Sequence, residues 1–200
     1  MILQMLLSIC VVSAAVAQSL SLQQNTVGET DEIEISVLAH LDGIRASGVS
    51  FYVALPMGAF EVLRSERPFV QGPLLAPAVE FINEIMPTAE AIGAPADVVL
   101  LPYAAVRGVG ADRGRTGEGI VARFSLRPLR AGASVVRLIS TPIYEAKLVL
   151  DDGIGERVFQ DLVDIELGVG GAERDKPVAG GNPSWGQVKA NGRNHLQVRR

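Results

Sequence analysis

The chain has 200 residues, 48% of them hydrophobic, which suits one domain with a core of its own plus flanking segments. Its formal net charge of -4 argues against nucleic acid as a partner. Cys10 is the only cysteine in the sequence, which excludes a disulfide framework within the chain.

The N-terminal segment, residues 1–17, has the pattern of a secretory signal peptide. An apolar stretch leads to Ala15-Val16-Ala17, which matches the A-x-A cleavage pattern. We therefore expect a protein that is secreted or held at the cell surface and begins at Gln18. A lipid anchor at Cys10 stays open, although Ile9 is bulkier than the residue expected before a lipidated cysteine. A retained N-terminal anchor is a further alternative. No later apolar run approaches the roughly 18 residues of a spanning helix, so the mature chain is predicted to contain no membrane span.

Several short segments after Gln18 alternate between apolar and polar residues, the pattern of half-buried strands. Turn-forming residues separate them, among them Asp42-Gly43 and Asp151-Asp152-Gly153. With no alternation of strands and helices, the pattern predicts an all-β antiparallel sandwich of about nine strands. The expected strands are 20–23, 33–37, 49–55, 60–63, 97–103, 120–127, 135–139, 146–150 and 163–167.

The best-defined strand is 120–127. Ile120, Ala122, Phe124 and Leu126 alternate with polar or smaller residues and are expected to face the core. Arg123, Ser125 and Arg127 would then share the outward face, and they are the candidate binding residues of this chain.

Two regions do not follow the strand pattern. Prolines interrupt residues 56–95, where Val79, Ile82 and Met86 have helical spacing and predict one short helix over 78–86. Residues 170–200 are rich in glycine and polar residues and are predicted to be a disordered tail. Trp185 within that tail is either a chance aromatic or part of a short docking motif. The folded domain is therefore expected to span 18–169.

No catalytic or cofactor-binding constellation is evident. The glycine-rich segment 108–119 lacks the Gly-Lys-Ser/Thr ending of a phosphate-binding loop and leads into a strand. The two histidines, His40 and His195, have no cysteine cluster beside them to complete a zinc site. Asp151 and Asp152 could contribute to calcium, but they lack the spacing of a calcium loop, and a plain turn is the better interpretation. We therefore expect a protein that is not an enzyme and has no cofactor.

Several of these segments resemble the cohesin domain. Val27-Gly28-Glu29 with 33–37 is similar to the family's opening strand, and Asp42-Gly43-Ile44 with 49–55 is similar to its third strand. The stretch 117–132 is the best single match, and the resemblance extends over about 20–169. Pro56-Met57-Gly58 and the proline-rich insertion depart from the family pattern.

The resemblance implies a nine-stranded jelly-roll sandwich and a non-catalytic module that binds a dockerin-type protein. The alternative is a module that binds a polysaccharide, because related cellulose-binding families share this fold. A flat platform for a polysaccharide needs several exposed aromatic rings, and apart from phenylalanines the domain offers only Tyr52, Tyr103 and Tyr144.

Overall fold

The computed structural model describes residues 17–25, 32–86, 96–108 and 114–169. Thirteen strands make up the regular structure of these residues. The expected signal peptide up to residue 16, Cys10, and the tail 170–200 with Trp185 lie outside the described residues. In the part of the chain that the structure describes, no helix has the length and apolar character needed to span a membrane.

Six strands form the first sheet, in the order β12-β1-β2-β8-β4, with β5 also paired to β8. Neighbouring strands are antiparallel except β1 and β12, which run parallel from the pair Ser19–Asp161 to the pair Ser21–Val163. The members are β1 (Ser19–Gln24), β2 (Ile33–His40), β4 (Phe60–Val62), β5 (Phe69–Gln71), β8 (Glu118–Pro128) and β12 (Asp161–Val163).

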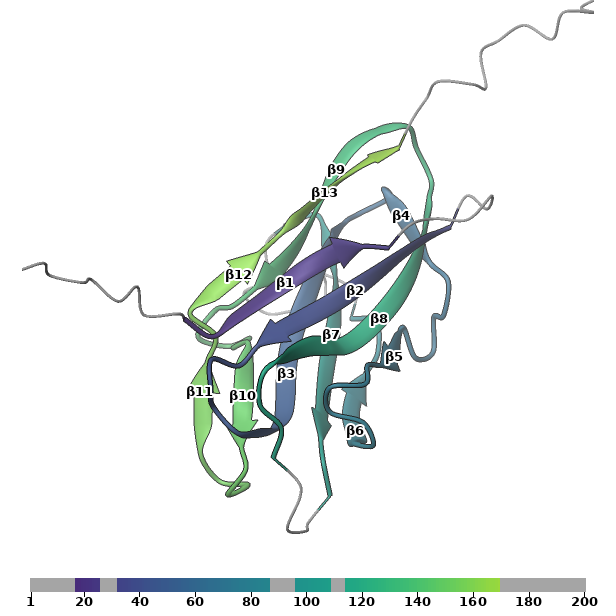
Figure 1. Ribbon diagram of the computed structural model, residues 1–200. Coiled ribbons are helices and arrows are strands. Elements are labelled where there is room, and N and C mark those ends of the chain that lie inside the picture. Colours follow the sequence, from purple (N-terminus) through teal and green to yellow (C-terminus); the bar gives the residue numbers. More distant parts are fainter. Residues whose placement is uncertain (1–16, 26–31, 87–95, 109–113, 170–200) are drawn as a thin grey trace, which may run out of the picture. The chain divides into compact units, whose positions relative to one another are not determined.

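Seven strands form the second sheet, in the order β11-β10-β3-β7-β6, and β9 pairs with both β3 and β13. The members are β3 (Ala46–Pro56), β6 (Val79–Asn83), β7 (Val98–Val106), β9 (Gly132–Ile139), β10 (Lys147–Leu150), β11 (Glu156–Val158) and β13 (Ile165–Val169). Figure 1 shows the six-stranded sheet in front of β3 and β7. The all-β sandwich predicted from the alternation is thus confirmed.

An aromatic group fills the space between the sheets. Phe51 and Tyr103 come from the seven-stranded sheet, and Phe69 and Phe124 come from the six-stranded sheet. The Phe69 ring lies 5.4 Å from Phe51, 5.1 Å from Tyr103 and 5.2 Å from Phe124. All four side chains are buried, so these contacts join the two layers at the centre of the core.

Side-chain amides join β5 to β6 at one open side of the sandwich. Asn83 accepts a hydrogen bond from the backbone N–H of Phe69 and donates one to its carbonyl, both at 2.9 Å. Gln71 makes the same two contacts with the backbone of Ala78, both at 3.0 Å. Each side-chain amide here uses one donor and one acceptor, as the backbone of a neighbouring strand would. We call the contacts of Asn83 and Gln71 together the amide clasp.

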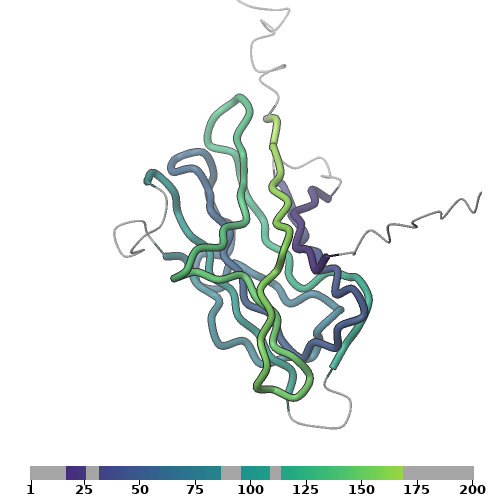
Figure 2. The backbone as a smooth tube through the Cα atoms, turned by 90° about the vertical axis from the view of Figure 1, so that its left-hand side faces the viewer, coloured from purple at the N-terminus to yellow at the C-terminus, as the bar shows by residue number. Residues whose placement is uncertain are grey.

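At the opposite side the chain itself crosses between the sheets. Asp164 follows β12 directly, and its carboxylate accepts a hydrogen bond of 2.9 Å from the backbone N–H of Leu138. The next residues form β13 in the seven-stranded sheet, where we expected one strand over 163–167. In Figure 2 this last stretch, coloured light green, runs down the middle of the view, on the side that faces the viewer.

A β-bulge corrects one expectation about β8. Ala122, Phe124 and Leu126 are buried as expected, but Ile120 is only half-buried and Val121 takes the core position. The reason lies in the register, because Val37 pairs with Ala122 whereas Leu38 pairs with Ile120. The extra residue on β8 shifts the alternation by one.

The helix expected over 78–86 is wrong, since this segment contains β6. Val79 pairs with Val106 and Ile82 with Ala104, with a shift of register between Glu80 and Ile82. The additional residue at Phe81 puts Val79 and Ile82 on the same face of a strand although they are three positions apart. A spacing that indicated a helix was therefore produced by a bulge.

Candidate functional site

The candidate binding residues Arg123, Ser125 and Arg127 lie in a row on the outer face of the six-stranded sheet. Glutamates of neighbouring strands face the two arginines. Arg127 is 3.4 Å from Glu32 and 3.0 Å from Glu61, and Arg123 is 3.9 Å from Glu34. The charges of this face are thus largely compensated within it, and contact of the three residues with a partner stays a prediction.

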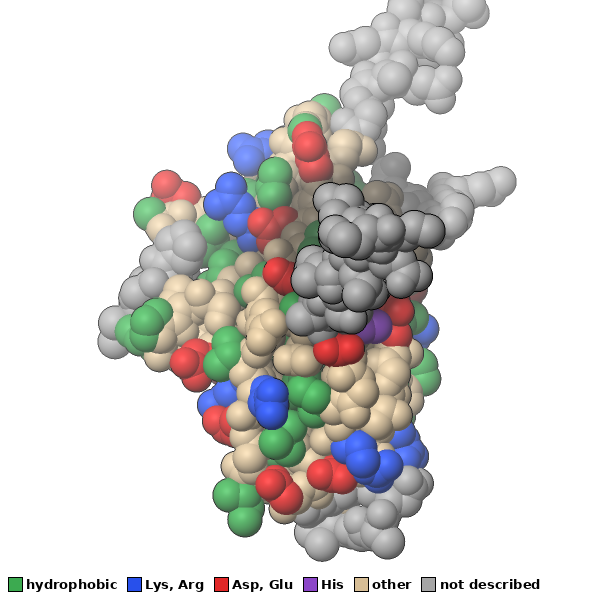
Figure 3. Space-filling model, turned by 60° about the vertical axis from the view of Figure 1, so that its left-hand side comes forward, with side chains coloured by type: hydrophobic (Ala, Val, Ile, Leu, Met, Phe, Trp, Pro, Cys, Tyr) green, Lys and Arg blue, Asp and Glu red, His purple; other side chains and the backbone are tan. Residues whose placement is uncertain are grey.

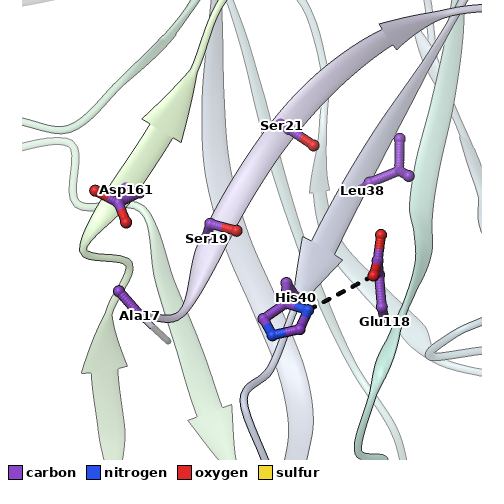
Figure 4. A pocket seen from close by; sticks show the side chains of 7 residues that line it. All are labelled: Ala17, Ser19, Ser21, Leu38, His40, Glu118 and Asp161. Atoms are coloured by element: carbon purple, nitrogen blue, oxygen red, sulfur yellow. Dashed lines mark ion pairs between the residues drawn. The ribbon is translucent and has the colours of Figure 1, made fainter. Parts of the chain in front are cut away.

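A shallow hollow of about 350 Å³ lies on the same sheet, near the start of β1. Its side chains include Ser19 and Ser21 of β1, His40 of β2, Glu118 of β8 and Asp161 of β12 (Figure 4). His40 Nδ1 is 3.6 Å from Glu118 Oε2. Among the residues with described positions, no serine hydroxyl is hydrogen-bonded to His40, and no group of three potential metal ligands occurs.

Charged side chains of both signs are interspersed over the side of the molecule that Figure 3 presents.

The Asp151–Gly153 segment forms the expected turn, with Gly153 at φ 76°. Asp151 is paired with Arg45 at 2.8 Å, and Asp152 accepts hydrogen bonds of 2.8 Å from the N–H groups of Ile154 and Gly155. Both carboxylates thus stabilise the loop itself.

Part of the outer face of the seven-stranded sheet, over β3, β7 and β9, carries apolar side chains. Phe51, Val53 and Leu55 of β3 point into the core, so Tyr52 and Ala54, which alternate with them, lie on the other face. Ala54 pairs with Leu100 of β7 on one side, and Tyr52 pairs with Ile139 of β9 on the other. These residues belong to a second hydrophobic group, the tyrosine cluster, made up of Tyr52, Ala54, Met86, Val98, Leu100, Ile139 and Tyr144.

Two tyrosine rings give this cluster its shape. The rings of Tyr52 and Tyr144 lie 5.0 Å apart at an interplanar angle of 63°, an edge-to-face contact. Tyr144 is only 8% exposed, and burial raises the pKa of Tyr52. Exposed apolar side chains of β6, Val79 and Ile82, continue the apolar surface beyond β7. The centre of the cluster is itself covered, since Ala54 is 2% exposed and Leu100 is fully buried. The apolar surface open to a partner on this side is therefore that of Val79 and Ile82, next to the half-buried rim of the cluster.

A second hollow, of about 360 Å³, adjoins the tyrosine cluster. We call it the arginine hollow, because Arg130 and Arg137 line it together with Asp97. It shares Ala54 and Val98 with the cluster, and Arg137 pairs with Ala54 across β9 and β3. Apolar and cationic surface are therefore continuous on this face.

The sequence of β7 carries a signal for this face. Every residue of β7, from Val98 to Val106, is nonpolar. A strand with only one buried face should alternate, so an uninterrupted apolar strand indicates apolar surface on both faces. Tyr52 and Tyr144 were noted only as possible carbohydrate contacts, and Tyr103 lies in the core at 1% exposure.

No protein-family model matches the chain, and no curated protein matches its sequence. Solved structures do resemble it in fold. A type II cohesin domain from the cellulosome of Acetivibrio cellulolyticus has a TM-score of 0.57 at 11% identity, covering 76% of this chain and 95% of that chain. The second type II cohesin module of an adaptor scaffoldin of the same organism has a TM-score of 0.57 at 11% identity, covering 77% and 98%.

A third similar chain comes from a type II cohesin–X-dockerin complex of Acetivibrio cellulolyticus. It has a TM-score of 0.56 at 11% identity and covers 74% of this chain and 98% of that chain. The resemblance noted in the sequence is thus confirmed at the level of fold, and the chain has the fold of cohesin modules.

Proposed function

We propose that this chain is a non-catalytic, exported binding module that docks a dockerin-type protein on the outer face of its seven-stranded sheet. The single observation that carries the choice of face is the pair of exposed apolar side chains of β6, Val79 and Ile82, which lie beyond β7 next to the half-buried residues of the tyrosine cluster. The partner class is supported by a similar solved chain, which belongs to a complex of cohesin with an X-dockerin.

The two outer faces differ in what they offer a partner. On the six-stranded sheet a partner would have to compete with the glutamates that already face Arg123 and Arg127. On the seven-stranded sheet it would cover Val79, which is 57% exposed, and Ile82, which is 37% exposed. Burial of apolar surface drives most protein association, so the second face offers the larger gain.

The test compares one variant from each face. Ile82→Glu puts a charge on the apolar face, and Arg127→Ala removes a candidate residue from the other. The full chain is used to capture proteins from the secretome of its source organism. Any dockerin-bearing protein found is then purified, and its affinity for the original chain and both variants is measured by calorimetry.

We expect the affinity to fall by roughly 30-fold or more with Ile82→Glu, the size of an interface hot spot, and to change little with Arg127→Ala. Capture of no dockerin-bearing protein would contradict the partner class. If Arg127→Ala lowered the affinity more than Ile82→Glu, the binding site would instead lie on the face of Arg123, Ser125 and Arg127. N-terminal sequencing of the exported protein tests the expected start at Gln18.

Polysaccharide binding is the weaker candidate. A platform for sugar rings requires coplanar aromatic faces, whereas Tyr52 and Tyr144 meet edge to face at 63°. Retention of the chain on insoluble cellulose, lost with Tyr52→Ala, would favour this alternative over the dockerin proposal.

A further inference from the structure

The arginine hollow brings two arginines, Arg130 and Arg137, together with one carboxylate, that of Asp97. Arg45, Arg67, Arg123 and Arg127 each face a carboxylate within ion-pair distance. Among the described residues, no ion pair or hydrogen bond links the side chain of Arg130 or Arg137 to a partner. Asp97 lines the same hollow without forming an ion pair with either arginine.

Register places Arg137 within the apolar face. It lies on β9 between Val135 and Ile139, which point to the same side of the strand, and it pairs with Ala54 of β3. Ile139 belongs to the tyrosine cluster, and Val135 lines the hollow. A partner that covers the cluster would therefore also enclose Arg137 and reduce its access to water.

We propose that the arginine hollow receives an acidic side chain of the docked protein, next to an apolar residue that packs on the tyrosine cluster. This inference rests on the proposed function and defines the chemistry of the partner. A guanidinium group presents paired N–H donors that fit the two oxygens of a carboxylate. The hollow has two guanidinium groups and only one carboxylate, Asp97, so a second anion supplied by the partner would offset the cost of enclosing them.

The charge of the hollow also selects among ligand classes. A neutral sugar supplies hydroxyl acceptors but no charge to balance Arg130 and Arg137. A peptide segment with an acidic residue beside a large apolar residue satisfies both parts of the surface at once. The partner is accordingly expected to carry a glutamate or aspartate directly beside its apolar contact residues.

The test uses two capped peptides, acetyl-Leu-Glu-Leu-amide and acetyl-Leu-Gln-Leu-amide, titrated into the isotope-labelled full chain at low ionic strength. They differ only in the charge of the central residue. We expect the glutamate peptide to bind about tenfold more tightly, the size of one charge-assisted hydrogen-bonded contact, and to shift the amide signals of Ala133 and Ser134. The difference should shrink at high salt.

The double variant Arg130→Gln/Arg137→Gln should abolish the preference for glutamate. The matched control Arg64→Gln/Arg157→Gln removes the same net charge from two exposed arginines that do not line the hollow, and it should retain the preference. Equal binding of both peptides, or a preference that survives in the first double variant, would overturn the inference. Neither outcome depends on a dockerin, so failure here is distinct from failure of the proposed function.

Discussion

The amide clasp makes the sharpest prediction for stability. Asn83 replaces a missing strand at the open side of the sandwich, because its side chain satisfies both backbone groups of Phe69 at 2.9 Å. Phe69 is 3% exposed and is the ring that contacts Phe51, Tyr103 and Phe124. Substitution Asn83→Ala would leave the N–H and the carbonyl of this buried residue without their partners.

The expected cost follows from those two contacts. A hydrogen bond contributes about 0.5–1.5 kcal/mol net, whereas a buried group left unsatisfied costs about 1–3 kcal/mol. With two groups affected, we expect Asn83→Ala to lower the free energy of unfolding by about 2–6 kcal/mol. Gln71→Ala is the matched variant, and it should cost only about 1–2 kcal/mol, because its partner Ala78 is half-buried and water can replace the amide.

Urea denaturation followed by far-UV circular dichroism measures the free energy of unfolding of both variants. The slope m checks that unfolding is two-state. A loss below about 0.5 kcal/mol for Asn83→Ala at unchanged m would refute the clasp, since that is the ordinary effect of a surface substitution. Equal losses for the two variants would refute the argument from burial.

Two further predictions concern the core. Gly72→Ala should lower the free energy of unfolding by about 1–3 kcal/mol in the same assay. The reason is that a Cβ there would overlap the carbonyl of Ile120 and lie 2.7 Å from the carbonyl carbon of Val121. Gly168→Ala is the control and should change stability little, because the space around its Cβ is open. Burial, and to a lesser extent Glu80, raises the pKa of the Tyr103 phenol above its ordinary value of 10.0. As the pH rises, the unfolded chain therefore loses this proton before the folded chain does. The free energy of unfolding should then fall above about pH 10, by up to about 1.4 kcal/mol per pH unit. Tyr103→Phe should remove this part of the pH dependence, and identical profiles for both chains would contradict it.

The strands that could be predicted are those long enough to show alternation. Residues 120–127 and 33–37 each repeat the pattern several times, and both are strands in the structure. β5 has three residues, too few for any periodicity to be visible. The burial of Ile120 and the secondary structure of 78–86 were predicted wrongly for the same reason. In both places a β-bulge inserts an extra residue, which strict alternation along the sequence does not reveal.

The candidate surface was harder to predict than the fold. Ala54 lies beside Leu100 and Arg137, residues far from it and from each other along the chain, only because β7 and β9 flank β3. Sequence alone does not state this order of strands. It does state which residues alternate on one strand, which is why the row Arg123, Ser125 and Arg127 was located correctly on an outward face while its contact with a partner stays a prediction.

The parallel pairing of β1 with β12 determines how the domain would respond to a pulling force. β1 begins at Ser19, and the chain continues from β12 into β13 in the seven-stranded sheet, which ends at Val169. Tension applied at the two ends would pull β1 and β12 in opposite directions along their length. The hydrogen bonds of their three residue pairs would then be loaded side by side and have to break together, whereas a hairpin pulled at its open end separates one pair at a time. The domain is therefore expected to resist extension through this short parallel pair.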